Sequence, residues 1–259
     1  MNRRTFIKMA GIAPYIGTLR FEDSIKSSAE TEASQGSVAA LFDKNQSGRL
    51  VMIASRPAMG KISFLLNLVN DLGIDSRMGC LFFSLELSKD ALKRRLLSIK
   101  PSSNLYINDS AGISIQELCS SCKNYKIISP DLKFVFVDYF QLIDSEIKHK
   151  NRRDRSSYIL KQLNQIAHEL NVTVIVAGQL NRSVENRTDR RPRPEDLREI
   201  RDLSSIDELL LLYRDSYYDK SFARNILEVT KFENNLKTIT RWSGEMSRPT
   251  QKISNFKRM

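Results

Sequence analysis

Short, continuous apolar runs recur along this sequence, and they limit its fold more than any other feature does. An unbroken apolar run of about five residues is typical of a β-strand buried on both faces of a sheet. The runs occupy residues 50–54, 80–84, 134–137, 172–177, 209–213 and 226–229. Stretches with helical periodicity lie between them, at residues 63–72, 88–98, 114–125 and 157–170. This alternation predicts βαβ crossovers, and therefore an α/β fold with a mostly parallel central sheet flanked by helices.

The predicted domain spans residues 46–250, preceded by a basic extension and flexible linker at 1–45 and followed by a basic tail at 251–259. Residues 3–8, Arg-Arg-Thr-Phe-Ile-Lys, resemble a bacterial twin-arginine export signal. The apolar stretch that follows is short and is broken by Pro14, and no small-x-small cleavage site is evident. Both an exported protein and a cytoplasmic protein with a frayed basic end therefore remain open.

Charge and composition narrow the class of partner. The formal net charge is 41 − 30 = +11, which favours a polyanionic partner but does not separate nucleic acid from a membrane surface. No apolar run approaches the roughly 18 residues that a membrane-spanning helix needs, so we expect no membrane span. Three Cys and two His make a disulfide framework or a four-ligand zinc site improbable.

The segment after the first apolar run has the pattern of a phosphate-binding loop (P-loop) between a strand and a helix. Backbone N–H groups of such a loop cradle phosphates, and its lysine reaches the β and γ oxygens of a nucleotide. Position 62 holds Ile where a Ser or Thr hydroxyl should bind Mg²⁺, and Ser63 is one residue out of register. The predicted nucleotide-binding residues are Ser55, Arg56, Pro57, Ala58, Met59, Gly60, Lys61 and Ile62.

Three further apolar runs lead into polar residues that suit nucleotide chemistry. Asp138 is placed to bind Mg²⁺ or its waters, Glu86 to polarise an attacking water, and Gln179 to sense a γ-phosphate. Each has a simpler alternative: an Asp that caps a strand, a Glu that complements a helix dipole, and an exposed Gln. Because carboxyl ends of parallel strands meet at one sheet edge, their joint occurrence favours a nucleotide site.

Ordered motifs resemble the bacterial replicative helicases of the DnaB family. They lie at residues 55–61, 83–88, 137–142, 178–185, 187, 191–192, 196–199 and 213–215, in the family's order. The resemblance covers residues 48–240, which correspond to the family's RecA-like P-loop NTPase motor domain, whereas residues 1–45 do not resemble the family's helical N-terminal domain. It implies ATP and Mg²⁺ as cofactors, a hexameric ring, and movement along single-stranded DNA in replication.

The resemblance also assigns roles to single residues. It implies that Lys61 binds phosphate, Glu86 activates water, Asp138 holds Mg²⁺, and Gln179 couples the nucleotide to the DNA loops. Lys231 would reach the nucleotide of a neighbouring subunit. Basic residues facing a channel suit sequence-independent phosphate contact, although a solvated charged loop is the alternative. The predicted DNA-binding residues are Arg187, Arg190, Arg191, Arg198, Glu199 and Arg201.

Departures from the family pattern predict weak or lost hydrolysis. Besides Ile62, the position of the family's finger arginine holds Glu233, where an anion would repel transition-state charge. Arg201 and Ser205 replace a Gly and a Gln near the DNA and the phosphate. The leading hypothesis is an ATP-dependent DNA helicase domain that forms a homo-oligomeric ring or joins another helicase. The alternatives are a catalytically inactive nucleotide- and DNA-binding subunit that regulates an authentic helicase, and an exported protein of unrelated role.

Overall fold

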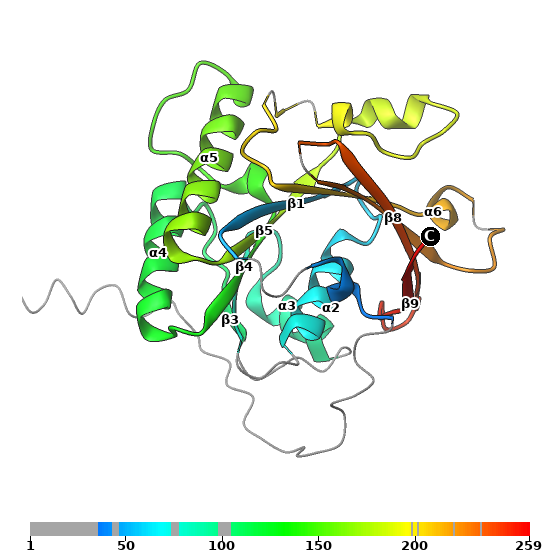
Figure 1. The fold of residues 1–259 in the computed structure, drawn as a ribbon, viewed down its shortest axis with the longest axis horizontal. Coiled ribbons are helices and arrows are strands. Elements are labelled where there is room, and N and C mark those ends of the chain that lie inside the picture. Colours follow the sequence, from blue (N-terminus) through cyan, green and yellow to red (C-terminus); the bar gives the residue numbers. More distant parts are fainter. Residues whose placement is uncertain are drawn as a thin grey trace, which may run out of the picture.

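A computed structural model of the protein describes residues 36–42, 47–73, 78–97, 105–197, 199–200, 202–219, 221–233 and 235–259. One twisted sheet runs through the molecule, with helices packed against both of its faces (Figure 1). The arginines at 3 and 4, and the predicted DNA-binding residues Arg198 and Arg201, lie outside the described residues. No helix in the described part of the chain is long and apolar enough to cross a membrane.

The sheet of the described residues has nine strands in the order β3-β2-β4-β5-β1-β6-β7-β8-β9. Pairing is parallel from β3 through β6 and antiparallel from β6 to β9, so most of the sheet follows the predicted parallel arrangement. The strands are β1 (Arg49–Ser55), β2 (Gly79–Ser84), β3 (Leu105–Asn108), β4 (Leu132–Asp138), β5 (Thr173–Gln179), β6 (Glu208–Tyr213), β7 (Ile226–Glu233), β8 (Thr238–Met246) and β9 (Ile253–Arg258).

Helices occupy the crossovers that the sequence predicts. The α-helices are α2 (Lys61–Gly73), α3 (Lys89–Leu97), α4 (Ile115–Ile128), α5 (Arg152–Leu170) and the short α6 (Asp215–Tyr218). Single 3₁₀ turns are η2 (Val38–Leu41), η3 (Phe140–Leu142), η4 (Arg182–Asn186) and η5 (Pro194–Asp196). Helix α4 begins with a capping box, in which the Ser114 hydroxyl accepts from the Glu117 N–H and the Glu117 carboxylate accepts from the Ser114 N–H.

Side chains on the two faces of β1 belong to two different hydrophobic cores, because successive side chains of a strand point to opposite sides. Leu50 and Met52 pack in the core beneath α4 and α5. Val51 and Ile53 pack in the core beneath α2 and α3, and η2 joins that second core. All four side chains are fully buried, which explains why the strand reads as an uninterrupted apolar run. The α/β prediction is confirmed.

Two segments outside the predicted domain boundaries of 46–250 pack against it or pair with its sheet. Val38 and Leu41 of η2 are buried against α2, although the sequence suggested a linker there. Residues 251–259, expected as a basic tail, contain β9, which pairs antiparallel with β8. Phe256 of β9 is buried and stacks on Trp242 of β8, with ring centroids 5.6 Å apart and planes 9° from parallel. Only Ile253 and Phe256 of β9 are buried, and its other residues are polar or charged. The sequence of β9 therefore lacks the continuous apolar run that predicted other strands of the sheet.

Parallel pairing aligns the strand ends that carry polar residues. Ser55 at the end of β1 is paired in register with Gln179 at the end of β5, and Ser84 of β2 with Asp138 of β4. The Leu85 N–H donates to the Asp138 carbonyl at 2.8 Å, which carries the residues after β2 along the same edge. The carboxyl edge of the sheet therefore gathers the predicted nucleotide-site residues.

Candidate functional site

Residues 56–60 form a tight loop between β1 and the N-terminus of α2. Ala58 and Gly60 both have left-handed backbone conformations, with φ of 61° and 96°. The left-handed backbone favours glycine at position 60, and a Cβ there would lie 2.7 Å from Met246 Cε, so the flexible end of that side chain would have to shift. The loop leaves the first N–H groups of α2 beside the open edge of the sheet, which is the arrangement that binds phosphate.

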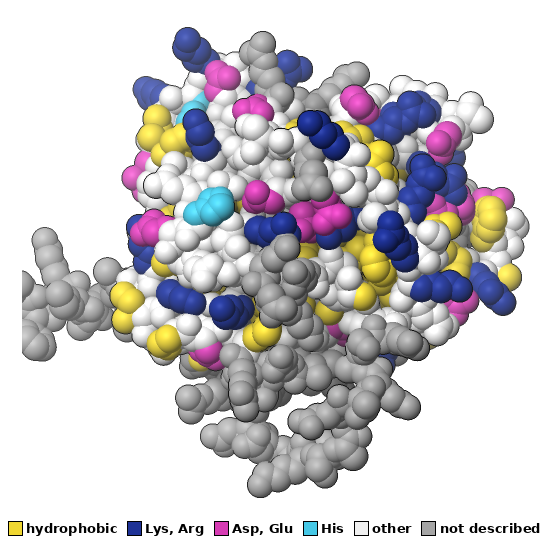
Figure 2. Space-filling model, in the orientation of Figure 1, with side chains coloured by type: hydrophobic (Ala, Val, Ile, Leu, Met, Phe, Trp, Pro, Cys, Tyr) yellow, Lys and Arg dark blue, Asp and Glu magenta, His cyan; other side chains and the backbone are white. Residues whose placement is uncertain are grey.

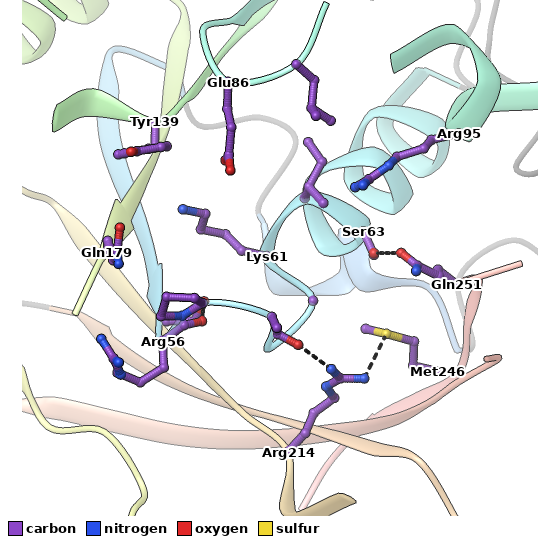
Figure 3. A pocket seen from close by; sticks show the side chains of 16 residues that line it. Arg56, Lys61, Ser63, Glu86, Arg95, Tyr139, Gln179, Arg214, Met246 and Gln251 are labelled. Atoms are coloured by element: carbon purple, nitrogen blue, oxygen red, sulfur yellow. Dashed lines mark hydrogen bonds between the residues drawn. The ribbon is translucent and has the colours of Figure 1, made fainter. Parts of the chain in front are cut away.

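A cavity of about 490 Å³ lies over this loop. Its wall includes Lys61 from the start of α2, Glu86 from the segment after β2, Tyr139 after β4 and Gln179 at the end of β5 (Figure 3). The loop residues of the wall are Ser55, Arg56, Pro57, Ala58, Gly60, Lys61 and Ile62, whereas Met59 is buried in the core. The structure therefore brings together most of the side chains that the sequence nominated for a nucleotide.

Lys61 lines the cavity, whereas Asp138 is buried beside Lys61 and is not part of the cavity wall. Lys61 Nζ lies 3.8 Å from Asp138 Oδ1 and 4.6 Å from the centre of the Tyr139 ring. Burial lowers the pKa of Lys61, against the opposing effect of the Asp138 and Glu86 carboxylates. Burial also raises the pKa of Asp138 to about 6, with Lys61 opposing the shift and Glu86 adding to it. Both charged side chains are thus poorly solvated. A bound anion would stabilise the charged form of Lys61, and a bound cation would stabilise the charged form of Asp138.

Asp138 can hold a cation together with a bound phosphate. Its side chain is 1% exposed, and Oδ1 has no hydrogen-bond partner among the described residues. The same part of the chain contains no cluster of three His, Cys, Asp or Glu side chains that could form a complete metal site. Mg²⁺ commonly uses one or two carboxylates, several waters and the oxygens of a substrate phosphate, so these residues fit Mg²⁺ bound with a nucleotide.

The position expected to supply a metal-binding hydroxyl is apolar. Ile62 lines the cavity and is partly buried against the core beneath α2 and α3. The adjacent Ser63 is buried, and its hydroxyl donates to Gln251 Oε1 in the turn before β9. Asn67, one turn further along α2, accepts from the Ile253 N–H at 3.0 Å. Ser63 is therefore committed to anchoring the β8–β9 turn and does not replace the missing hydroxyl.

Arg214 is a site residue to which the sequence assigned no role, although Tyr213-Arg214-Asp215 belonged to a recognised motif. Its Nη2 donates to the Ala58 carbonyl in the loop, and its Nη1 donates to Asn225 Oδ1 at 3.1 Å. No carboxylate pairs with it among the described residues, and burial lowers the pKa of its guanidinium. Figure 3 shows Arg214 below the loop and Arg95 on the opposite wall. Both cations suit a cavity that receives a polyanion.

Two of the arginines predicted to contact DNA, Arg187 and the half-exposed Arg191, form ion pairs within the chain. Arg187 forms two hydrogen bonds with the Asp196 carboxylate, at 3.1 and 2.9 Å. Arg191 likewise pairs with Glu228, at 2.8 and 2.9 Å, and lies over the Tyr213 ring. Two-pronged pairs of this kind hold an arginine firmly in one orientation. These two side chains therefore build the loop rather than project freely from it.

Arg190 and Glu199, the other predicted DNA contacts that the structure describes, have different surroundings, and Arg193 is a further arginine of the same segment. Arg190 stacks its guanidinium 4.6 Å from the centre of the Tyr218 ring. Glu199 lines a separate cavity of about 260 Å³ together with Arg152 and Arg155 at the start of α5. Arg193 is exposed on the same loop as Arg190. On the face drawn in Figure 2, Lys and Arg side chains are widespread and many have acidic neighbours, so no continuous basic stripe crosses it.

Lys231 does not lie at the cavity. Its ammonium is within 3.0 Å of Glu208 Oε2 and 2.8 Å of Glu233 Oε1, and it donates to the Leu41 carbonyl at 2.7 Å. Arg49 completes this buried cluster by pairing with Glu208. The resemblance predicts that Lys231 reaches the nucleotide of a neighbouring subunit, and this stays a prediction. Within the chain the lysine forms ion pairs, so Lys231 and Glu233 neutralise one another.

Comparison with known proteins agrees with this geometry. A family model described as the DnaB-like helicase C terminal domain matches residues 39–103 and 100–241. The chain is 37% identical to a probable replicative DNA helicase of Trieres chinensis, over 68% of this chain and 45% of that protein. It is 33% identical to the replicative DNA helicase DnaC of Bacillus subtilis (strain 168), over 73% of this chain and 47% of the relative.

Solved structures give the same result. A DnaB-like replicative helicase, described with its interactions with primase, superimposes with a TM-score of 0.75 at 30% identity, covering 81% of this chain and 57% of that one. A second solved structure, described as an ATPase domain, matches with the same TM-score and identity, over 82% of this chain and 86% of its own. The chain spans about half the length of the curated relatives it matches. It belongs to the family of DnaB-like helicase C-terminal domains.

Proposed function

We propose that this chain is a RecA-like motor domain that binds ATP with Mg²⁺ and acts on single-stranded DNA in replication. The observation that carries the proposal is that Lys61, Glu86 and Gln179 line one cavity over the phosphate-binding loop, with the buried Asp138 carboxylate 3.8 Å from Lys61. The family membership supports it, because its relatives are named as replicative helicases. A family of ring-forming motors also favours a homo-oligomer or association with another helicase, acting in the cytoplasm.

Each residue of the cavity has a proposed task. Lys61 and the N–H groups at the start of α2 bind the β- and γ-phosphates. Asp138 would hold Mg²⁺, which neutralises phosphate charge when bound. Glu86 is exposed to the cavity and can orient and polarise water for attack. Gln179, at the end of β5, would respond to the γ-phosphate.

A second candidate is a subunit that binds nucleotide and DNA without turning ATP over. Ile62 lacks the metal-binding hydroxyl, and Glu233 pairs with Lys231 within the chain. Steady-state ATP hydrolysis with and without single-stranded DNA, measured beside nucleotide binding, separates the two candidates. DNA-stimulated turnover supports the motor. Binding without turnover supports the regulatory subunit, and absence of nucleotide binding removes both.

Ile62→Thr should raise Mg²⁺-dependent ATP turnover by about tenfold or more, because it restores a hydroxyl ligand at the metal. The measurement is hydrolysis rate as a function of Mg²⁺ concentration. Ile62→Val is the matched control, since valine has nearly the shape of threonine without the hydroxyl. Equal rates for the Thr and Val variants would show that the hydroxyl is not what limits turnover.

Mg²⁺-supported nucleotide binding should weaken as the pH falls through about 6, where the buried Asp138 carboxyl takes up a proton. A protonated carboxyl is a poor Mg²⁺ ligand, so the Mg²⁺ contribution to affinity should fall by about tenfold per pH unit at the acidic limit. The same raised pKa means that folding favours the protonated form. This group's contribution to stability therefore decreases as the pH rises from its ordinary value near 3.8 to about 6.

Nucleotide titrations at pH 7.5 and pH 5, with Mg²⁺ and with excess chelator, measure this effect. Asp138→Asn provides the control, because an amide does not titrate in this range. An identical fall in affinity for the Asn variant would assign the pH dependence to another group.

We also propose that the folded unit extends beyond residues 46–250 at both ends, which is supported by the burial of η2 and the pairing of β9.

A further inference from the structure

Arg56 ties the phosphate-binding loop to the segment that follows β5. Its Nε donates to Glu185 Oε1 at 2.8 Å, and its Nη1 donates to the Leu180 carbonyl at 2.8 Å. The Arg56 side chain is 12% exposed and that of Glu185 is 33% exposed, so the ion pair is partly shielded from water. Arg56 also lines the cavity, and Figure 3 shows its side chain extending away from α2.

The segment contacted by Arg56 behaves as one connected unit, which we define as residues 180–197. The Asn181 N–H donates to the Asp196 carbonyl at 3.1 Å, and Arg187 binds the Asp196 carboxylate. The Arg193 N–H donates to the same carboxylate at 2.7 Å, which closes the unit on itself. A displacement at Glu185 is therefore transmitted to the rest of the unit. Three of the basic residues for which the sequence suggested DNA contact, at positions 187, 190 and 191, lie within it.

We propose that Arg56 and Glu185 are a positioning pair that couples occupancy of the phosphate-binding loop to the conformation of residues 180–197, and thereby to single-stranded DNA. The inference rests on the proposed function. A bound nucleotide brings several negative charges beside the loop, and they compete with the Glu185 carboxylate for the Arg56 guanidinium. The pair thus has different energies in the nucleotide-free and nucleotide-bound protein, which is the requirement for coupling two sites.

The guanidinium of Arg56 is suited to linking the phosphate-binding loop with residues 180–197. A guanidinium can serve a carboxylate and a carbonyl simultaneously through separate N–H groups in one plane, as the Nε and Nη1 contacts show. A lysine keeps the positive charge but cannot hold both partners in that fixed geometry. Arg56→Lys should therefore reduce the effect of DNA on nucleotide affinity, and Glu185→Gln, which changes no residue predicted to bind nucleotide, should reduce it while keeping nucleotide affinity near that of the parent. A purely structural role would predict a loss of stability instead.

The test is the factor by which a thymidine oligonucleotide changes the dissociation constant of a fluorescent, non-hydrolysable ATP analogue. It is measured on the full chain and on the Glu185→Gln, Arg56→Lys and doubly substituted Arg56→Lys/Glu185→Gln proteins. This ratio of dissociation constants, the coupling factor, should move at least about threefold toward unity in both single variants. Glu185 also faces Tyr218 and Arg190, and both single changes alter the Arg56–Glu185 contact, so the double variant should add little to either single change where that contact carries the coupling.

Glu169→Gln is the matched control, because it removes the Lys123–Glu169 ion pair, 2.7 Å long, on helices α4 and α5. Its coupling factor should equal that of the parent, and thermal midpoints should be alike in all variants. A parental coupling factor that survives in Glu185→Gln overturns this inference and leaves the proposed function intact. A parent protein that binds neither the analogue nor the oligonucleotide overturns both.

Discussion

Lys61→Ala should weaken nucleotide binding by roughly a hundredfold, which corresponds to about 2.7 kcal/mol at the site. The lysine is the first residue of α2, it lines the cavity, and it lies beside Asp138 at 3.8 Å. Removing it deletes a charge-assisted contact to phosphate and leaves the Asp138 carboxylate buried without its cationic neighbour. Equilibrium titration with a fluorescent ATP analogue in the presence of Mg²⁺ measures the loss.

Lys133→Ala gives a matched control for this change. Lys133 lies on β4, the strand that ends at Asp138, but outside the cavity. Its removal should leave nucleotide affinity within about twofold of the parent, because surface charges contribute little at this separation in salt. Thermal midpoints recorded on both variants separate a binding defect from unfolding. Unchanged affinity in a folded Lys61→Ala protein would mean that nucleotide does not bind at this loop.

Glu86→Gln should reduce ATP hydrolysis by about 10²–10⁴-fold while leaving nucleotide affinity nearly unchanged, since a general base acts on the attacking water rather than on bound phosphate. Glu86 lines the cavity close enough to Lys61 and Asp138 to influence both of their pKa values. Glutamine retains the size and polarity of the side chain but cannot accept the proton. Single-turnover hydrolysis and analogue binding, compared on the same protein, give the two quantities.

The experiment is best performed in the Ile62→Thr background, where turnover is expected to be fastest. Asp90→Asn is the control, because Asp90 is an exposed carboxylate in the first turn of α3, four residues beyond Glu86. That variant should hydrolyse ATP at the rate of its parent. If Glu86→Gln also retains the parental rate, then water is activated by another group and the proposed assignment of Glu86 is wrong.

Whether the chain hydrolyses ATP or only binds it separates the two candidate functions. Lys231, Glu208 and Glu233 form a cluster closed within the chain, and no free cation of that cluster projects from the described residues. In a ring built only of this chain, Lys231 would have to leave these ion pairs to reach a neighbouring nucleotide, whereas Lys237 and Arg241 are exposed cations in the segment from β7 to β8. The second candidate function follows from the closed cluster, since association with an authentic helicase would supply cations from a partner.

The local patterns of the sequence were sufficient to predict β1, the loop after it and the helix that follows. An unbroken apolar run, a Gly-Lys pair and helical periodicity are properties of neighbouring residues, and they act over distances of a few positions. Asp138 and Gln179 were predictable for the same reason, because each ends an apolar run. β9 was not, since Ile253 and Phe256 are separated by exposed polar residues and followed by charged ones that resemble a tail.

The sequence by itself determined the fold class and which side chains meet at the carboxyl edge of the sheet. Only the tertiary structure decided which charges remain available for ligands. Lys231 reaches the Leu41 carbonyl across 190 positions, and Arg56 reaches Glu185 across 129. Local periodicity determines the helices and strands of the backbone. A charged side chain, in contrast, pairs with the group that the folded structure brings within about 3 Å of it. Such partners are fixed by the fold as a whole, so charge patterns along the chain do not reveal them.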